Sequence, residues 1–260
     1  MKYDIIISIN VHEKFEYLIN QINNINEYVS LKKKIILNCN DYMFEQMSNK
    51  EIPDVDVFPE PLNKKPFHGS LMHGIACNMS HALNNYDFEY FLVMSSREFF
   101  YRKLGNTSQL DEHLIDERSI KTENVDFRMP NFYPAGNYCK VRGGHNDWLG
   151  ASGAVVNLWW WPKFSSTKLY QYIEQHNLNF AHSMHEGMCF SRSTCKSIIN
   201  FFGDYQDIMN ELFTFDGCVE EFALQSIASN YGGFYYIGNG CDTKSLDEVD
   251  TNKFTYKRSR

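Results

Sequence analysis

The sequence predicts an α/β protein whose central sheet is mostly parallel and is flanked by helices. Three short apolar segments, residues 3–9, 34–37 and 89–94, contain few polar residues and end abruptly in polar ones, as buried parallel strands do. The segments between them carry apolar residues at the spacing of a helix. Alternating strands and helices are typical of a parallel sheet covered on both faces.

The elements of the first half follow from these periodicities. In the first helix, for example, Phe15, Leu18, Ile22 and Ile25 fall on one side. The expected elements are, in order, a strand at 3–9, a helix at 13–28, a strand at 34–37, a short helix at 42–47, a weaker strand at 54–58, a loop with three prolines at 59–66, a long helix at 68–84 and a strand at 89–94.

The second half of the chain has a less regular pattern. Residues 130–160 are rich in Gly, Asn, Tyr and Trp, which favours loops. The expected elements are strand-like pieces near 125–129 and at 148–149, helices at 167–175, 194–202 and 218–231, a strand at 233–237 and a polar tail from 243 onward. No internal repeat or linker is visible, so we predict a single domain over residues 1–260, with halves at 1–104 and 105–260.

The composition excludes several classes of protein. The chain has 25 Lys and Arg against 32 Asp and Glu, and its net charge of −7 argues against a nucleic-acid binder that neutralises phosphates over a broad surface. Hydrophobic residues make up 43% and charged residues 22%, which predicts a sizeable core and not disorder. No apolar run approaches the ~18–20 residues of a membrane span. The N-terminal segment is interpreted as a strand and not as a signal peptide.

The seven cysteines predict neither a disulfide framework nor a zinc site, because their number is odd and no CxxC spacing occurs. Reduced thiols in a cytoplasmic protein are the expected state. His182 and His185 lie three residues apart, as metal ligands can, although packing or polar contacts are the favoured interpretation of both.

Polar residues follow three of the predicted strands, at 10–12, 38–41 and 95–98. In an open α/β sheet, ligands bind beyond the carboxyl ends of the strands. These three segments are therefore candidates for a binding site, although strand ends are also polar simply because loops are.

The segment from His68 to Leu104 reads HGSLMHGIACNMSHALNN and then YDFEYFLVMSSREFF around a short break. It resembles a unit of the core-2/I-branching β-1,6-N-acetylglucosaminyltransferases, a family with the GT-A fold, in which a long helix precedes a strand that closes in a small-x-Asp-Phe-Pro turn. Ser95, Ser96 and Phe99 fit this pattern, but Glu98 replaces the Asp and Phe100 replaces the Pro. Neither sequence has the Asp-x-Asp that most GT-A enzymes use to hold Mn²⁺.

Two further segments resemble the same family in the correct order. Residues 220–227, EEFALQSI, are similar to the family's Asp-Glu-Phe-x-x-x-Thr helix start, whose Glu is the catalytic base. This alignment places Glu221 on the base and Ser226 on the Thr, with Glu220 beside the base. Asn252-Lys253-Phe254 resembles an Asn-Lys-Phe near the family's C-terminus, whose Lys faces the diphosphate of the nucleotide sugar.

The resemblance implies a GT-A-like, Rossmann-like glycosyltransferase that moves a sugar from a UDP- or GDP-sugar to a glycan acceptor with inversion. Residues 1–104 would bind the nucleotide sugar, and residues 105–260 would bind the acceptor and carry out catalysis. No metal cofactor is expected. Mn²⁺ is the alternative, with Glu98 as its ligand. Among glycosyltransferases, so short a chain most resembles those encoded by large algal DNA viruses, which would place it in the host cytoplasm.

Inverting transfer requires a base for the acceptor hydroxyl and a positive charge near the leaving diphosphate. Glu221 is the preferred base and Glu220 the alternative, and we expect the dipole of the following helix to keep Glu221 ionised at neutral pH. Both residues can also simply favour the positive end of a helix. Without a metal, Lys253 is the first candidate for the diphosphate, followed by Lys257 and Arg258, although a solvated basic tail is the alternative.

The remaining candidates come from the strand ends, the long helix and the irregular region. His73 can approach the phosphates, although a packed helix histidine is the favoured interpretation. Trp148 and Glu186 are the candidates for the acceptor, because aromatic rings suit sugar faces and carboxylates suit hydroxyl groups. The candidates for the nucleotide sugar are Val11, His12, Asn38, Asn40, Asp41, His73, Ser95, Ser96 and Arg97.

Three other functions fit the same residues. The chain could be a carbohydrate-binding protein without catalysis, a structural protein of a virion, or a retaining glycosyltransferase that uses Mn²⁺ at Glu98 or another acid.

Overall fold

The computed structural model describes residues 2–12, 14–115, 139–141, 161–178, 180–182, 185–243 and 252–258. The elements up to the middle of the chain are β1 (Lys2–Val11), α1 (Phe15–Tyr28), β2 (Lys33–Cys39), α2 (Asp41–Met47), β3 (Val55–Val57), α3 (Ser70–Asn85), β4 (Asp87–Ser95), β5 (Glu98–Phe100), the 3₁₀ helix η1 (Thr107–His113), β6 (Leu114–Ile115) and β7 (Cys139–Val141). The later elements are α6 (Trp161–Phe164), α7 (Lys168–Gln175), β8 (Phe180–His182), β9 (Met188–Ser191), α8 (Arg192–Asp204), α9 (Gln206–Phe213), the 3₁₀ helix η3 (Val219–Glu221), α10 (Ala223–Ser229), β10 (Phe234–Tyr236), β11 (Gly238–Thr243) and β12 (Thr255–Arg258).

The central sheet has seven strands in the order β3-β2-β1-β4-β9-β10-β6. The first four strands pair in parallel. β9 runs antiparallel to β4, and β10 antiparallel to β9, so β10 points in the same direction as the first four. Only β9 and β6 run the other way in this sheet. The prediction of a mixed α/β fold with a mostly parallel sheet is confirmed.

The order of the strands reverses at β1. The chain passes from β1 through α1 to β2 and β3 on one side, and returns through α3 to β4 on the other side of β1. In doubly wound sheets, such a reversal opens a crevice at the carboxyl ends of the two strands involved. A ligand site is therefore expected where β1 and β4 end, after Val11 and Ser95.

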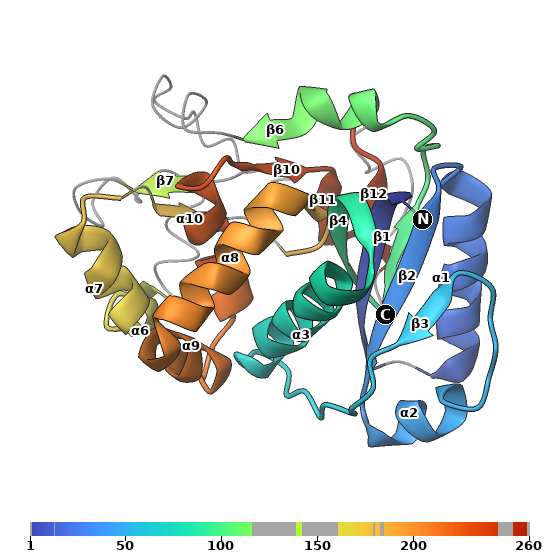
Figure 1. Ribbon diagram of the computed structural model, residues 1–260, viewed down its shortest axis with the longest axis horizontal. Coiled ribbons are helices and arrows are strands. Elements are labelled where there is room, and N and C mark those ends of the chain that lie inside the picture. Colours follow the sequence, from blue (N-terminus) through green and yellow to red (C-terminus); the bar gives the residue numbers. More distant parts are fainter. Residues whose placement is uncertain are drawn as a thin grey trace.

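Successive side chains of β1 point to opposite faces of the sheet and enter two separate cores. Ile5, Ile7 and Ile9 pack with apolar residues of α1 and α2. Ile6 packs instead with residues of α3, α8 and α10. Figure 1 shows α1 and α3 on either side of the strands β1 and β2. Both faces of the sheet are covered, which leaves its carboxyl edge as the place for chemistry.

A second, three-stranded sheet forms from segments far apart in the sequence. β12 pairs antiparallel with β5 and parallel with β11. Within the polar tail, residues 255–258 form a strand that the sequence did not predict, and the fully buried Phe254 and Thr255 anchor it. The last strand of the chain is thereby fixed beside the segment that follows β4.

The elements of the first half match the prediction to within a few residues at each end. The helix expected at 218–231 is a 3₁₀ turn followed by the short α10. The described elements that the sequence pattern missed are β5, η1, β6, β7, α6, β8, β9, α9, β11 and β12. The strands expected near 125–129 and at 148–149 lie outside the described residues, as does Trp148. Within the described part of the chain, no helix is both long and apolar enough to cross a bilayer.

Candidate functional site

The carboxyl ends of β1 and β4 meet at the strand-order reversal. His12 follows β1 and is exposed, whereas Ser96 follows β4 and is buried. The Ser96 hydroxyl oxygen lies 3.2 Å from Nδ1 and 3.3 Å from Nε2 of His12. The hydroxyl of the preceding Ser95 is buried and has no hydrogen-bond partner in the described structure. Polar groups are therefore present at this edge of the sheet.

Because β9 is antiparallel to β4, the start of β9 lies beside the end of β4. The Gly187 amide donates a hydrogen bond of 3.0 Å to the Val93 carbonyl oxygen. Gly187 has a φ of +80°, and a Cβ at this position would lie 2.3 Å from the Gly238 nitrogen. Only glycine fits such a close approach. This turn holds the two preceding residues, His185 and Glu186, at the same edge.

The C-terminal strand β12 brings Lys257 to this edge. The Lys257 ammonium donates to Glu186 Oε1 at 2.5 Å. In the antiparallel register, Lys257 lies opposite Glu98. The Thr255 hydroxyl donates to one Glu98 oxygen, and the Ser95 amide donates to the other at 3.1 Å. Thus β12 joins two buried carboxyl groups, Glu98 of β5 and Glu186 of the turn before β9.

Two more acids come from η3. His185 Nδ1 lies 3.4 Å from Glu186 Oε2 and 3.8 Å from Glu220 Oε1. Glu186 and Glu220 are each 1% exposed, whereas Glu221 is partly exposed. The Oε2 atoms of Glu186 and Glu220 have no hydrogen-bond partner among the described residues. We call the group Glu98, His185, Glu186, Glu220, Glu221 and Lys257 the acid cluster.

Glu186 carries the negative charge of the acid cluster. Burial opposes its ionisation, but the nearby His185 and Lys257 outweigh burial and hold the Glu186 pKa at about 2. His185 is half-buried, and desolvation lowers its pKa below the ordinary value although Glu186 acts in the opposite direction. Lys257 is therefore the main partner of the Glu186 carboxylate at neutral pH.

The other acids of the cluster hold protons. Burial, together with the charge of Glu186, raises the pKa of Glu221 to about 8, although Lys257 acts against the rise. Burial and then Glu221 raise the Glu220 pKa well above its ordinary value. Burial also raises the Glu98 pKa to about 8, against the hydrogen bond from Thr255. The expectation that a helix dipole keeps Glu221 ionised at neutral pH is wrong, because desolvation dominates at this position.

The two other basic residues of the tail have different surroundings from Lys257. The Lys253 ammonium donates to the Tyr236 carbonyl oxygen at 2.8 Å and lies 5.3 Å from the centre of the Tyr236 ring. Lys253 thus packs against the end of β10. The side chain of Arg258 lies outside the described part.

Several residues that were predicted to contact the nucleotide sugar instead make contacts that stabilise the fold. Val11 is fully buried in the core beneath α1, so its side chain is not available to a ligand. The Asn40 side chain caps α2 by accepting from the Met43 amide at 2.9 Å. Asp41 is the first residue of α2, and its carboxylate accepts from the Asn63 amide at 2.5 Å. These residues have local structural roles.

The other residues predicted to contact the nucleotide sugar lie on different sides of β1. His73 stacks on Phe213 with the ring centres 4.4 Å apart, and burial lowers its pKa, which supports the packed interpretation. Asn38 is completely buried, and neither end of its amide has a partner in the described structure. Arg97 is half-buried at the end of β4. Asn38 lies on the β2 side of β1, whereas the acid cluster lies on the β4 side.

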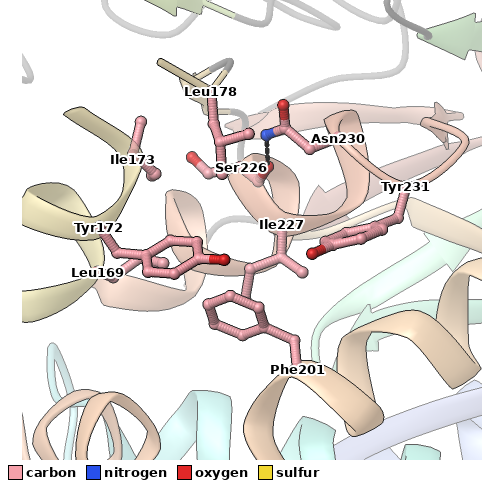
Figure 2. A pocket seen from close by; sticks show the side chains of 9 residues that line it. All are labelled: Leu169, Tyr172, Ile173, Leu178, Phe201, Ser226, Ile227, Asn230 and Tyr231. Carbon is pink, nitrogen blue, oxygen red and sulfur yellow. Dashed lines mark hydrogen bonds between the residues drawn. The ribbon is translucent and has the colours of Figure 1, made fainter. Parts of the chain in front are cut away.

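Ser226 has a structural role. Its hydroxyl donates to the Ala181 carbonyl at 2.9 Å and accepts from the Ala181 amide at 3.1 Å, which ties α10 to β8. Figure 2 shows that Ser226 also borders a small pocket between α7, α8 and α10. The lining is mainly apolar and consists of Leu169, Tyr172, Ile173, Leu178, Phe201, Ser226, Ile227, Asn230 and Tyr231. This pocket contains no member of the acid cluster.

The residues at the end of β4 do not fit a divalent cation. Hard cations such as Mg²⁺ require several free oxygen ligands. Both oxygens of Glu98 already accept hydrogen bonds, from Thr255 and Ser95. In the described segments, no group of three or more His, Cys, Asp or Glu side chains is arranged to hold a metal ion.

The fold and the site define a mixed α/β protein with a Rossmann-like strand order and a buried charged cluster at the carboxyl edge of its sheet. Neither protein-family models nor curated protein sequences give a match to this chain.

Sequence reasoning missed the pairing of Lys257 with Glu186. It named His185 with polar contacts as the favoured interpretation, but not as a neighbour of Glu186 and Glu220. The motif His185-Glu186-Gly187 carried a usable signal, because a glycine directly after two polar residues often marks a tight turn. The pairing of Lys257 with Glu186 left no such signal, because it depends on where β12 packs.

Proposed function

We propose that this protein is an inverting glycosyltransferase that uses a nucleotide sugar and a glycan acceptor. The observation that carries the proposal is the acid cluster, which places an ionised carboxylate, proton-holding carboxyl groups and a lysine together beside the strand-order reversal. The order of the sequence segments that resemble the β-1,6-N-acetylglucosaminyltransferases supports the same class. A GT-A-like arrangement is part of this proposal.

Glu221 is the proposed general base, because it is the acid of η3 that is partly exposed. A base is most effective when its pKa lies near the working pH, and the Glu221 pKa of about 8 meets this condition. In the reaction, the acceptor oxygen attacks the anomeric carbon of the sugar. The bond from that carbon to the diphosphate breaks with its electron pair, and the acceptor proton passes to Glu221.

Lys257 is the proposed cation for the leaving diphosphate. Its ammonium lies in the cluster, whereas Lys253 is held by the Tyr236 carbonyl. To contact a phosphate, Lys257 must exchange its hydrogen bond with Glu186 for one with the ligand. Glu186 Oε2 has no hydrogen-bond partner in the described structure and suits an acceptor hydroxyl. Trp148 remains a proposed acceptor contact, outside the described residues.

A screen of nucleotide sugars by thermal shift tests the first half of the proposal, because a ligand stabilises the folded state according to RT ln(1 + [L]/Kd). Each stabilising compound is then incubated with the protein and a panel of glycans, and the products are analysed by mass spectrometry. We expect one nucleotide sugar to stabilise the protein and a glycan to gain one sugar.

Stabilisation without any transfer or hydrolysis of the nucleotide sugar would instead favour a binding protein. The absence of any stabilising nucleotide sugar, nucleotide or glycan would contradict the proposal as a whole.

A further inference from the structure

A second unusual cation, Lys64, lies at the carboxyl end of β2, on the other side of β1 from the acid cluster. Its ammonium donates to the backbone carbonyl oxygens of Asn38 and Leu62, each at 2.9 Å. Both acceptors are neutral. No carboxylate lies within ion-pair distance of Lys64 among the residues that the structure describes. Lys64 therefore lacks the counter-charge that half-buried lysines normally have.

The side chain of Lys64 occupies a slot beside α3. A Cβ added to Gly74 of that helix would lie 2.8 Å from Lys64 Cε and 2.3 Å from Asn10 Oδ1. The absence of a side chain at Gly74 therefore allows the lysine stem to lie between the helix and the strand ends. This packing fixes the position of the amine instead of leaving it on a mobile side chain.

The Lys64 amine interacts electrostatically with Cys39 of β2 and with Cys77 and His73 of α3. Burial lowers the Lys64 pKa to about 8, although the two cysteines act in the opposite direction. Burial raises the pKa of Cys39 to about 12 and that of Cys77 to about 11, the latter with a small contribution from Glu60. Near neutral pH the cysteines are thiols, and within this group the Lys64 amine is the one that forms a stable amide with an acyl donor.

Open hydrogen-bonding groups lie beside the lysine slot. Asn10 and Asn38 are register partners on β1 and β2, so their side chains point to the same face of the sheet. The Asn10 amide donates to the Leu71 carbonyl, but its Oδ1 has no partner in the described structure, and the Asn38 amide has none at either end. These groups can bind the polar atoms of a small substituent on the amine.

We propose that Lys64 is a site of covalent acylation, at which its amine reacts directly with small activated acyl donors such as acyl phosphates. The lone pair of the neutral amine attacks the acyl carbon, and an amide bond forms. The bond to phosphate breaks and phosphate leaves with the electron pair, while the amine loses a proton to water. The modification removes a positive charge at the end of β2. It does not depend on the proposed glycosyl transfer.

The adjacent Lys65 is the matched control, because it is exposed and differs from Lys64 by one position. The intact protein is treated with limiting acetyl phosphate at pH 7.5, and acetylation of each lysine is followed by peptide mass spectrometry. An ordinary lysine has a pKa of about 10.4. The lower pKa of Lys64 leaves a far larger fraction of its amine neutral at pH 7.5. The lower basicity and the partial burial of this amine reduce its reactivity in part. We expect Lys64 to react roughly tenfold faster than Lys65.

In protein unfolded with guanidinium, we expect the two lysines to react at the same rate. Equal rates in the folded protein, or a preference for Lys64 that persists on unfolding, would overturn the proposal. The variant Cys77→Ser tests the route. Unchanged acetylation of Lys64 supports direct attack by the amine, whereas its loss in a folded variant shows that a cysteine is the first acceptor and overturns direct acylation.

Discussion

The ammonium of Lys257 and the carboxylate of Glu186 form a 2.5 Å ion pair that joins the C-terminal strand to the start of β9. The Glu186 side chain is 1% exposed and that of Lys257 is 18% exposed. Removing one partner of a buried ion pair typically costs about 3–5 kcal/mol, because the other charge remains buried without compensation. The pair therefore couples the stability of β12 to the geometry of the candidate site.

The first prediction concerns this coupling. We expect Lys257→Met to lower the free energy of unfolding by roughly 2–4 kcal/mol, somewhat less than for a fully buried pair. The double variant Glu186→Gln/Lys257→Met should recover much of the loss, because no uncompensated charge remains. Urea denaturation of the four proteins in a double-mutant cycle measures the coupling. Additive effects of the two substitutions would show that the pair contributes nothing.

The second prediction concerns stability as a function of pH. The Glu98 pKa rises from an ordinary 4.5 to about 8 in the folded protein. The protonated Glu98 carboxyl therefore contributes its full amount to the free energy of unfolding below pH 4.5. Between pH 4.5 and 8 the unfolded chain loses this proton more readily than the folded one, and the free energy of unfolding falls. Glu221, with a similar pKa, has the same effect. Glu186, with a pKa of about 2, has the opposite effect and loses its contribution as the pH falls below 4.5.

We therefore expect the melting temperature to be highest near pH 5 and to decrease steadily toward pH 8. Glu98 alone accounts for a decrease in stability of the order of 4 kcal/mol over this range. Glu98→Gln should make the curve flatter and raise the melting temperature at pH 8, because the amide is neutral at every pH. Thermal denaturation of the wild-type protein and of Glu98→Gln from pH 4 to 9 tests this prediction. Parallel curves of melting temperature against pH would contradict a raised Glu98 pKa.

The third prediction tests the base of the proposed reaction. Glu221→Gln should leave the fold and the affinity for the nucleotide sugar intact but lower kcat by about 10²–10⁴, the usual cost of losing a general base. Glu45→Gln, an exposed glutamate on α2, is the control and should have normal activity. Near-normal turnover of the Glu221 variant would exclude it as the base and direct attention to Glu220.

The activity should also depend on pH in a defined direction. The proposed base must be unprotonated, and the Glu221 pKa of about 8 means that only a minority of molecules are active at pH 7. The value of kcat/KM is therefore expected to rise from pH 6.5 to 9 and to level off above pH 8. Initial rates measured across this range test the prediction, after correction for any unfolding at high pH. A rate that is constant from pH 5.5 upward would mean that the base is a carboxylate with an ordinary pKa.

Much of the fold was predictable because its first half depends on local signals. Apolar runs identify β1 and β4, and the spacing of Leu18, Ile22 and Ile25 identifies α1. β9 and β12 are only four residues each, and such short segments give no reliable periodicity. The sequence named the acids Glu186 and Glu221 as candidates, but it could not predict their ionisation states. Those states depend on burial and on Lys257, which is 71 positions from Glu186 in the sequence.

The fourth prediction separates the two lysines that compete for the diphosphate. The sequence resemblance assigns this role to Lys253, whereas the structure places Lys257 in the acid cluster and Lys253 on the Tyr236 carbonyl. Deleting the tail would not distinguish them, because it would remove β12 and the Thr255 hydroxyl that bonds to Glu98. The single variants Lys257→Gln and Lys253→Gln are therefore compared by isothermal titration calorimetry, with the nucleoside and the nucleoside diphosphate that the screen identifies.

We expect Lys257→Gln to weaken binding of the diphosphate by about tenfold or more and to leave the nucleoside almost unaffected, because a charge-assisted hydrogen bond contributes roughly 1.5–3 kcal/mol. Lys253→Gln should have a smaller effect. Addition of EDTA should not change either affinity, and restoration of lost affinity by Mn²⁺ would show that a metal supplies the charge instead. Equal losses for the nucleoside and its diphosphate in the Lys257 variant would show that this residue supports the site only through its pair with Glu186.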